Sequence, residues 1–482
     1  MNKRVLVAVG SAAALLLVAS VAAARNPHCA GGIQYVVQGL KDKERGNTED
    51  YMRQMNKAVD QLSMCAAEDT EDLEALGYLG WALAEIDSAG PAGAAFQKSI
   101  DGLTAKGDKK KVEIVTTNRE HYWSVAYNDG IKHIGDAQGI YPDFTKQPTA
   151  EEKDLKAEAA KSYNAAVLSL TRAKLMKPKH PGTMRNLATA FALMGRYDEA
   201  EAVLKNGQTE AAGDAEVGVL TEALKSVRAN KAGALLDAKK FDEAIVYYQE
   251  LTKGDPTNAD QFTGLGSALF SRAQTKQDAA KRADFKLAGE AYGKAFELNS
   301  KSSDLGFNAA LSFQYAGELA LSEAEWRAVL QQNPDDPEAL SSQGSTLADM
   351  QKFAEAVEVL NRAVNLKPDN KIYFRQLGAV YSKASNNAKA TEMLMVYMAI
   401  NNGKAATDVA AATKASGKAG SGAANTLTAM GSPGAVYEWS SEGKQLQTWV
   451  YAAKKVSFTF DSGSGVLVQK SDWGSTGAVP KK

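Results

Sequence analysis

The stretch from Glu338 to Pro368, EALSSQGSTLADMQKFAEAVEVLNRAVNLKP, decides the fold of this chain. In it, small and large apolar residues recur at the spacing of two short amphipathic helices joined by a turn. The first helix carries Leu340, Gly344 and Leu347, and after the turn at Phe353 the second carries Ala356, Leu360 and Ala363. Pro334 and Pro368 lie 34 residues apart, and each ends a segment of this form. The stretch therefore predicts a helical hairpin that repeats along the chain.

The same spacing recurs over most of the sequence. Further copies cover residues 76–96, 187–204, 232–256, 262–295, 310–334 and 374–394. This pattern resembles the tetratricopeptide repeat (TPR) family, in which small residues let the two helices of a hairpin approach each other. The resemblance implies a mostly α fold, an α-helical solenoid of about nine hairpins over residues 29–400. Insertions near residues 135–153 and 271–284 are expected as surface loops or extended helices.

A different composition follows residue 400. Residues 401–425 are rich in Ala and Gly and predict a linker with a short helix. Residues 426–474 then predict a small α+β domain with an antiparallel sheet, followed by a tail at 475–482. The expected strands are 435–440, 446–451, 456–460 and 466–470. Around Met430-Gly431-Ser432-Pro433, Thr448-Trp449-Val450-Tyr451 and Val456–Phe460 this domain resembles the SmpA/OmlA-type small outer-membrane assembly lipoproteins. The resemblance implies an envelope location and protein partners.

The N-terminal residues 1–24 have the pattern of a secretory signal peptide. Lys3 and Arg4 precede an uncharged apolar run from Val5, and small residues end it at Ala24. We expect export and cleavage after Ala24. The run of about 20 residues is also long enough to span a bilayer, so retention as a membrane anchor is the alternative.

The only two cysteines, Cys29 and Cys65, lie near the expected mature N-terminus. Two helical patterns separate them, from about 33 to 43 and from about 48 to 63. In an antiparallel hairpin the start of the first helix lies beside the end of the second, so the two residues are expected as a disulfide that staples the terminal repeat. Two buried free thiols are the alternative.

Composition and motifs argue against several classes of function. Basic residues number 56 and acidic residues 57, so no dominant basic surface points to nucleic acid. Lys109, Lys110 and Lys111 are expected as a solvated loop between hairpins. Four His and two Cys offer little for a metal site, and no phosphate loop, HExxH or GxSxG motif occurs. We therefore expect no enzyme activity, no cofactor and no metal.

The inner surface of a TPR array is lined by the first helix of each hairpin. Positions on those helices that the repeat spacing leaves free are candidates for binding a peptide or a partner helix. They are Trp81, Arg185, Phe270, Phe307, Gln314, Tyr315, Arg375 and Lys383. Packing between neighbouring repeats is the alternative role for the aromatic members of this set.

These observations predict a protein–protein interaction scaffold of the bacterial cell envelope. The TPR groove would bind peptide or protein partners, and the C-terminal domain would contact another. The expected location is periplasmic or otherwise extracytoplasmic, with membrane association if residues 1–24 are retained. An enzyme or carrier acting on envelope polymers, such as cell-wall glycan, is the alternative, and converging carboxylates in a pocket would favour it.

Overall fold

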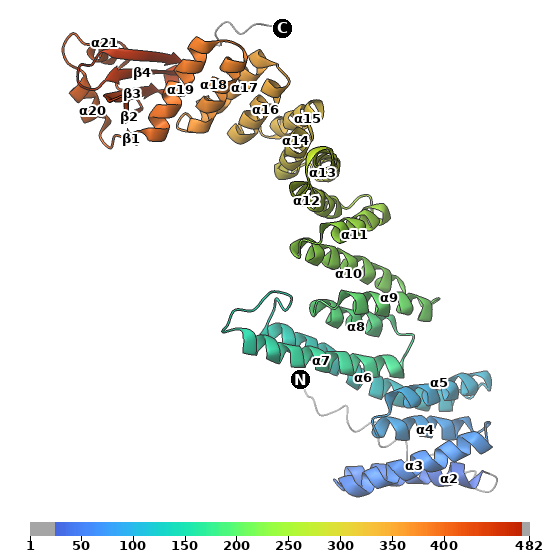
Figure 1. The fold of residues 1–482 in the computed structure, drawn as a ribbon. Coiled ribbons are helices and arrows are strands. Elements are labelled where there is room, and N and C mark those ends of the chain that lie inside the picture. Colours follow the sequence, from blue (N-terminus) through green and yellow to red (C-terminus); the bar gives the residue numbers. More distant parts are fainter. Residues whose placement is uncertain (1–24, 475–482) are drawn as a thin grey trace. The chain divides into compact units, whose positions relative to one another are not determined.

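The structure is a computed structural model that describes residues 25–474, so the predicted signal peptide and tail lie outside the described residues. Within this range eighteen consecutive helices come first, most of them packed on the next helix as antiparallel hairpins, and a small sheet follows them (Figure 1). The predicted fold class, a helical solenoid of about nine hairpins with a small α+β end, is confirmed. Among residues 25–474 no helix is both long and apolar enough to cross a bilayer.

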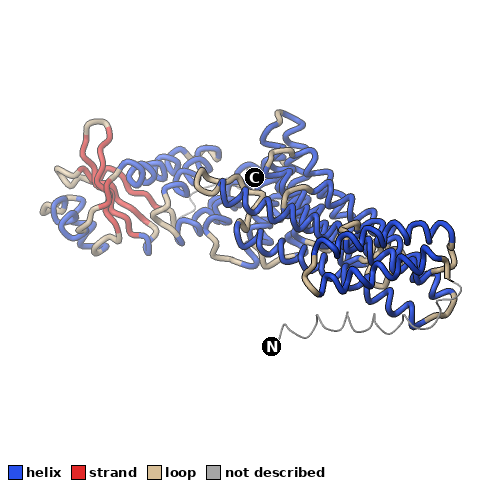
Figure 2. Tube along the Cα trace, turned by 90° about the horizontal axis from the view of Figure 1, so that it is seen from below, coloured by secondary structure: helices blue, strands red, loops and turns tan. Residues whose placement is uncertain are grey.

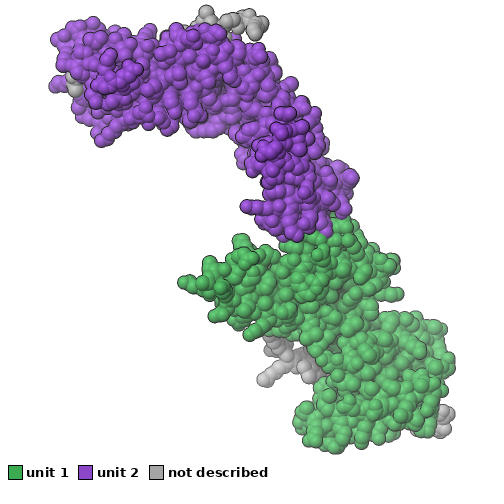
Figure 3. All heavy atoms as spheres, viewed as in Figure 1, with its two compact units in different colours: residues 1–231 green, residues 232–482 purple. Residues whose placement is uncertain are grey.

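The chain divides into two compact units, residues 1–231 and 232–482 (Figure 3). The hairpins of unit 1 are α2 (Pro27–Glu44) with α3 (Thr48–Glu68), α4 (Leu73–Glu85) with α5 (Ala89–Ala105), α6 (Lys109–Ile140) with α7 (Lys153–Met176), and α8 (Pro181–Leu193) with α9 (Tyr197–Glu210). The boundary falls within α10 (Gly218–Asp237).

Unit 2 continues the same hairpin order. Its helices are α11 (Phe241–Gly254), α12 (Ala259–Thr275), α13 (Asp278–Leu298), α14 (Ser303–Ala316), α15 (Leu319–Gln332), α16 (Pro337–Asp349), α17 (Phe353–Leu366), α18 (Lys371–Lys383) and α19 (Asn387–Asn402). Helix α16 begins where the carboxylate of Asp336 accepts the backbone N–H of Glu338 and of Ala339, both at 3.0 Å. This cap satisfies donors that the helix itself leaves free.

In several hairpins a small residue of the first helix faces a large side chain of the second. A Cβ atom on Gly344 would lie 2.6 Å from Leu360, and one on Gly266 would lie 2.8 Å from the ring of Tyr292. The side chain of Leu360 is fully buried, and burying a side chain of this size stabilises the fold by about 2 kcal/mol. The residues whose spacing predicts the hairpins are therefore the residues that pack the two helices of a hairpin against each other.

The first hairpin carries both cysteines. A disulfide joins Cys29 of α2 to Cys65 of α3, with their Cα atoms 4.9 Å apart and both side chains buried. The antiparallel packing of the two helices brings these residues together, because one lies near the start of α2 and the other near the end of α3.

Helices α6 and α7 are longer than the repeat requires. Lys109, Lys110 and Lys111, predicted as a solvated loop, instead begin α6, so that prediction is wrong. The carboxylate of Asp108 accepts the N–H of Lys111 at 3.1 Å and starts the helix there. The insertion near residues 135–153 extends α6 to Ile140 and forms the loop before α7.

A small sheet of antiparallel strands lies at one end of the chain (Figure 2). Its five strands have the order β1-β2-β3-β4-β5. They are β1 (Lys404–Ala405), β2 (Ala435–Ser441), β3 (Lys444–Tyr451), β4 (Val456–Asp461) and β5 (Leu467–Asp472). One face packs on α19, where Trp439 and Leu446 meet Ala399. The other face packs on α20 (Val409–Ser416) and α21 (Gly422–Met430), where Trp449 and Phe460 lie among Ala412 and Ala423.

The sheet is fixed directly to the last hairpin. The Nζ atom of Lys389 donates to the carbonyl of Asp472 at 2.7 Å, and the hydroxyl of Ser471 donates to the carbonyl of Glu392 at 2.9 Å. The buried ring of Trp473 packs edge to face on Phe374 of α18. Residues 401–425, predicted as a linker, hold β1 and α20. The sheet thus covers the surface of α19 that a further repeat would otherwise cover.

Candidate functional site

Three side chains in unit 2 occupy the same repeat position. Tyr315, Asp349 and Lys383 follow one another at 34-residue intervals, at or next to the last residue of α14, α16 and α18. All three are exposed. The ammonium group of Lys383 lies 3.0 Å from the carboxylate of Asp349. We call Tyr315, Asp349 and Lys383 the inner row.

An aromatic cluster lies at one end of the inner row. The ring centroid of Tyr315 is 5.1 Å from that of Phe285 and 6.1 Å from that of Phe270, and those two rings meet at 5.1 Å. Phe270 is half-buried and Phe285 is buried, so the ring of Tyr315 packs on two side chains that are themselves held in the interior. Tyr315 itself remains 52% exposed. The result is a rigid aromatic surface with a free phenolic edge, which is the kind of side chain that dominates protein interfaces.

Polar side chains tie the neighbouring first helices together. The amide of Gln314 donates to the carboxylate of Asp349 at 3.4 Å. The hydroxyl of Ser341 donates to the Oε1 atom of Gln376 at 2.6 Å, and Gln376 donates to the hydroxyl of Ser345 at 3.0 Å. These bonds hold α14, α16 and α18 in register beside the inner row, so its spacing is built into the fold.

The predicted site residues of unit 2 divide into two groups. Phe270, Gln314, Tyr315 and Lys383 are brought together along the inner row, and Arg375 is exposed on the same helix as Lys383. Phe307 is half-buried and packs edge to face on Trp326, with ring centroids 4.7 Å apart. Phe307 therefore packs between helices, which is the alternative role expected for the aromatic residues of this set.

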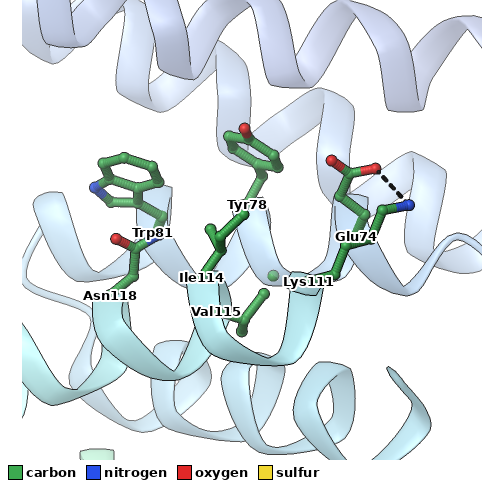
Figure 4. A pocket seen from close by; sticks show the side chains of 8 residues that line it. Glu74, Tyr78, Trp81, Lys111, Ile114, Val115 and Asn118 are labelled. Carbon is green, nitrogen blue, oxygen red and sulfur yellow. Dashed lines mark ion pairs between the residues drawn. The ribbon is translucent and has the colours of Figure 1, made fainter. Parts of the chain in front are cut away.

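The predicted site residues of unit 1 lie apart from each other. Trp81 is buried and stacked on Tyr78, with ring centroids 6.0 Å apart. Both rings line a cavity of ≈ 20 Å³ between α4 and α6 (Figure 4), which has room for about one water molecule. Arg185 is exposed on α8, where its Nε atom donates to Asn186 at 3.3 Å.

A larger hollow of ≈ 800 Å³ lies between α5 and the end of α7 in unit 1. Small residues, including Gly90 and Gly93, line it together with Leu175. Asp101 is the one carboxylate that lines it, and Glu74 is the one carboxylate that lines the smaller cavity. Neither hollow has the converging carboxylates that polymer hydrolysis requires.

One grouping in residues 25–474 has the closeness of a metal site, namely Cys29, Cys65 and Asp72. The two sulfur atoms are bonded to each other, so they cannot act as thiolate ligands. Asp72 is already held by Arg25, whose guanidinium donates to both of its carboxylate oxygens. The grouping therefore stabilises the start of α4 and does not offer a metal site.

Sequence reasoning missed two residues of the candidate site. Asp349 stands between Tyr315 and Lys383 at the same 34-residue spacing, and that spacing is the signal that would have found it. Phe285 supports Tyr315 from the second helix of the preceding hairpin, α13. No repeat position marks Phe285, because the stretch around it departs from the regular unit.

Known proteins match parts of the chain. The curated small glutamine-rich tetratricopeptide repeat-containing protein 2 of Mycosarcoma maydis is 30% identical over 109 residues, which cover 22% of this chain and 30% of that relative. Among solved structures, MamA of Desulfovibrio magneticus RS-1 is 18% identical and covers 36% of this chain and 94% of its own, with a TM-score of 0.31. The C-terminal part of a TPR repeat-containing protein of Cytophaga hutchinsonii is 15% identical and covers 50% and 92%, with a TM-score of 0.33. TM-scores this low do not show a shared overall arrangement.

The family match falls on the helices that carry the candidate surface. Residues 307–371, from α14 to the start of α18, match the family model described as tetratricopeptide repeat. They include the stretch whose small and large residues predict the hairpin, and two of the three inner-row residues. Over this segment the chain is similar to the tetratricopeptide repeat family.

Proposed function

We propose that this protein is a protein–protein interaction scaffold that holds an extended peptide segment of a partner along the inner row of unit 2. The observation that carries the proposal is the inner row itself, in which Tyr315, Asp349 and Lys383 are exposed at one repeat position of three successive hairpins. Periodic side chains of different chemistry suit a ligand that is itself periodic, and an extended peptide has that property.

The dimensions of the helices agree with a peptide ligand. Packed helices lie about 10 Å apart, and an extended chain advances about 3.3 Å per residue. Two neighbouring first helices can therefore contact two side chains of the peptide that are about three residues apart. Tyr315 offers the aromatic contact that contributes most to affinity, while Asp349, Lys383 and Arg375 select the charge pattern of the ligand.

The second part of the proposal is export to the bacterial cell envelope. The apolar segment before Arg25 has the pattern of a signal peptide. The buried disulfide between Cys29 and Cys65 suits an oxidising compartment. Fractionation of cells, with the mass of the N-terminal peptide measured, tests this part. A mature chain that begins at Arg25 in the periplasmic fraction supports it, and a cytosolic chain that begins at Met1 contradicts it.

The C-terminal domain is proposed as a second contact surface, as the SmpA/OmlA resemblance implies. Val466, Leu467 and Val468 are three consecutive apolar residues that remain exposed beside the sheet edge. Exposed runs of this kind are unusual on soluble domains unless a partner uses them. Replacement of Leu467 by Ser, which is expected to leave the fold intact, tests whether partner recovery depends on this run.

Affinity purification tests the scaffold function. A tagged wild-type chain and the double variant Tyr315→Ala, Lys383→Ala are recovered from envelope extracts, and the bound proteins are identified by mass spectrometry. The exposed Leu321 on the second helix α15 supplies the matched control Leu321→Ala. The proposal expects partners to be lost from the double variant and retained by the control. Equal recovery in all three samples contradicts it.

A further inference from the structure

His180 connects two helices of unit 1, α6 and α8, through one ring nitrogen. It immediately precedes α8, and its Nδ1 atom accepts the backbone N–H of Thr183 at 3.0 Å. The same Nδ1 atom lies 2.9 Å from the hydroxyl of Thr183, and that hydroxyl accepts the indole N–H of Trp123 on α6 at 3.0 Å. The ring of Trp123 also packs on the imidazole, with centroids 4.7 Å apart.

These contacts require a neutral imidazole. A backbone N–H can only donate, so the Nδ1 atom of His180 must present its lone pair to Thr183. The Thr183 hydroxyl accepts from Trp123, and its own proton is then directed at Nδ1. A proton on Nδ1 would place two donors against each other and would remove the side-chain cap from α8.

Charged groups surround the ring from several elements. Lys177, in the turn after α7, lies with its ammonium 4.1 Å from the centre of the Trp123 ring and 2.9 Å from the carboxylate of Glu120. Burial lowers the pKa of His180 below 6.5, and the charge of Lys177 lowers it further. Three carboxylates raise the pKa of His180 in turn. They belong to Glu216 and Asp214, from the segment between α9 and α10, and to Glu120 of α6.

We propose that His180 is a pH-sensitive latch that ties α6 to the start of α8 while the ring is neutral and releases this contact when the ring is protonated. The imidazolium then turns away from Thr183 toward the carboxylates of Glu216, Asp214 and Glu120, which stabilise its charge. Acidification thereby frees the backbone N–H of Thr183 in the first turn of α8 and removes the acceptor that orients the Thr183 hydroxyl toward the indole of Trp123.

The direction of the effect follows from linkage. The folded chain holds the ring neutral more strongly than the unfolded chain does, because the pKa of His180 is lowered on folding. The contribution of the latch is complete above about pH 6.5 and is lost as the pH falls through the lowered pKa of the folded state.

Hydrogen exchange of residues 181–187 between pH 7.5 and pH 5 tests the latch, with rates corrected for intrinsic exchange. In the wild-type chain we expect protection to fall about fivefold, which is the size expected when a helix loses its N-terminal side-chain cap. The variant His180→Asn keeps a side-chain acceptor at the cap but does not titrate, so its protection should stay constant. His121→Asn, which replaces an exposed histidine on α6, should behave like the wild type.

Two results would overturn the proposal. One is the same loss of protection in His180→Asn and in the wild-type chain. The other is an NMR titration of the wild-type protein in which His180 titrates at or above the pKa of a free imidazole. The NMR measurement needs no variant, so it decides the question even if His180→Asn does not fold.

Discussion

Asp349 of α16 and Lys383 of α18 form an ion pair of 3.0 Å, although 34 residues of sequence separate them. The pair is exposed, so it adds little to the free energy of unfolding. Its importance is positional, because it extends the line that begins at the aromatic cluster around Tyr315. A peptide along this line meets an aromatic ring, a carboxylate and an ammonium group in a fixed order.

The contacts of the Glu85 carboxylate predict that acid weakens the packing of four helices in unit 1. The carboxylate accepts the hydroxyls of Tyr51 and Tyr122 and the ammonium group of Lys43, and so joins helices α2, α3 and α6 to α4. Burial raises the pKa of Glu85, but its three donors outweigh burial and leave the pKa below 4.5. Its contribution to stability is therefore present above about pH 4.5 and is lost as the pH falls through the lowered pKa.

Glu85→Gln should lower the free energy of unfolding by about 2–3 kcal/mol at pH 7, because it weakens three hydrogen bonds to a buried charge. Urea unfolding at pH 7 and pH 4 measures both the loss and its pH dependence. The exposed Glu44 on α2 gives the control Glu44→Gln, for which a change within about 0.5 kcal/mol is expected. Equal effects of the two replacements would contradict the role of Glu85.

The disulfide should stabilise the terminal hairpin through its closed loop. The two cysteines are 36 residues apart, and closure of a loop of this size is worth about 3–4 kcal/mol in the chain-entropy account. The double variant Cys29→Ala, Cys65→Ala should lose hydrogen-exchange protection in α2 and α3 first. Ser63→Ala, at an exposed position of α3, should not. Unchanged protection of α2 and α3 in the double variant would mean that packing alone holds this hairpin.

Two glycines of α5 form a matched pair for testing the contact between α5 and α7. A Cβ atom on Gly93 would overlap the backbone carbonyl of Leu175, whereas one on Gly90 would have no neighbour closer than 3.8 Å. Gly93→Ala should therefore lower the free energy of unfolding by about 1–3 kcal/mol through overpacking. Gly90→Ala should leave it unchanged or raise it by up to about 1 kcal/mol, because alanine favours the helix. Thermal unfolding of both variants makes the comparison, and similar midpoints would argue against this close approach.

Much of the fold was predictable because it rests on local patterns. The spacing of Gly344 and Leu360 is a periodic signal, and the structure uses it as the contact within one hairpin. The alternation in Val456, Phe458 and Phe460 likewise predicts a strand, which is β4, but its prediction of one buried face is wrong, because Ser457 and Thr459 on the opposite face are buried as well. Both features involve residues near in sequence, so the chain reveals them directly.

Other features depend on contacts between distant residues and were not predictable. Trp81 and Tyr315 are both aromatic residues on first helices, yet α6 covers Trp81 while Tyr315 stays exposed. The pairing of β1 with β2, within the predicted linker, joins Lys404 to Glu438 in register and cannot be read from an Ala- and Gly-rich composition. Such outcomes are decided by which element packs on a residue, and composition does not specify that element.

The most direct test of the account is site-specific photo-cross-linking in living cells. A benzophenone amino acid replaces Tyr315 in one variant and Leu321 in another; both positions are exposed, the first on the first helix of a hairpin and the second on its second helix. We expect the probe at position 315 to link to discrete envelope proteins and the probe at position 321 not to do so. Cross-linking to the same proteins with equal yield from both positions, or none from position 315, would contradict the claim that the inner row binds the partner.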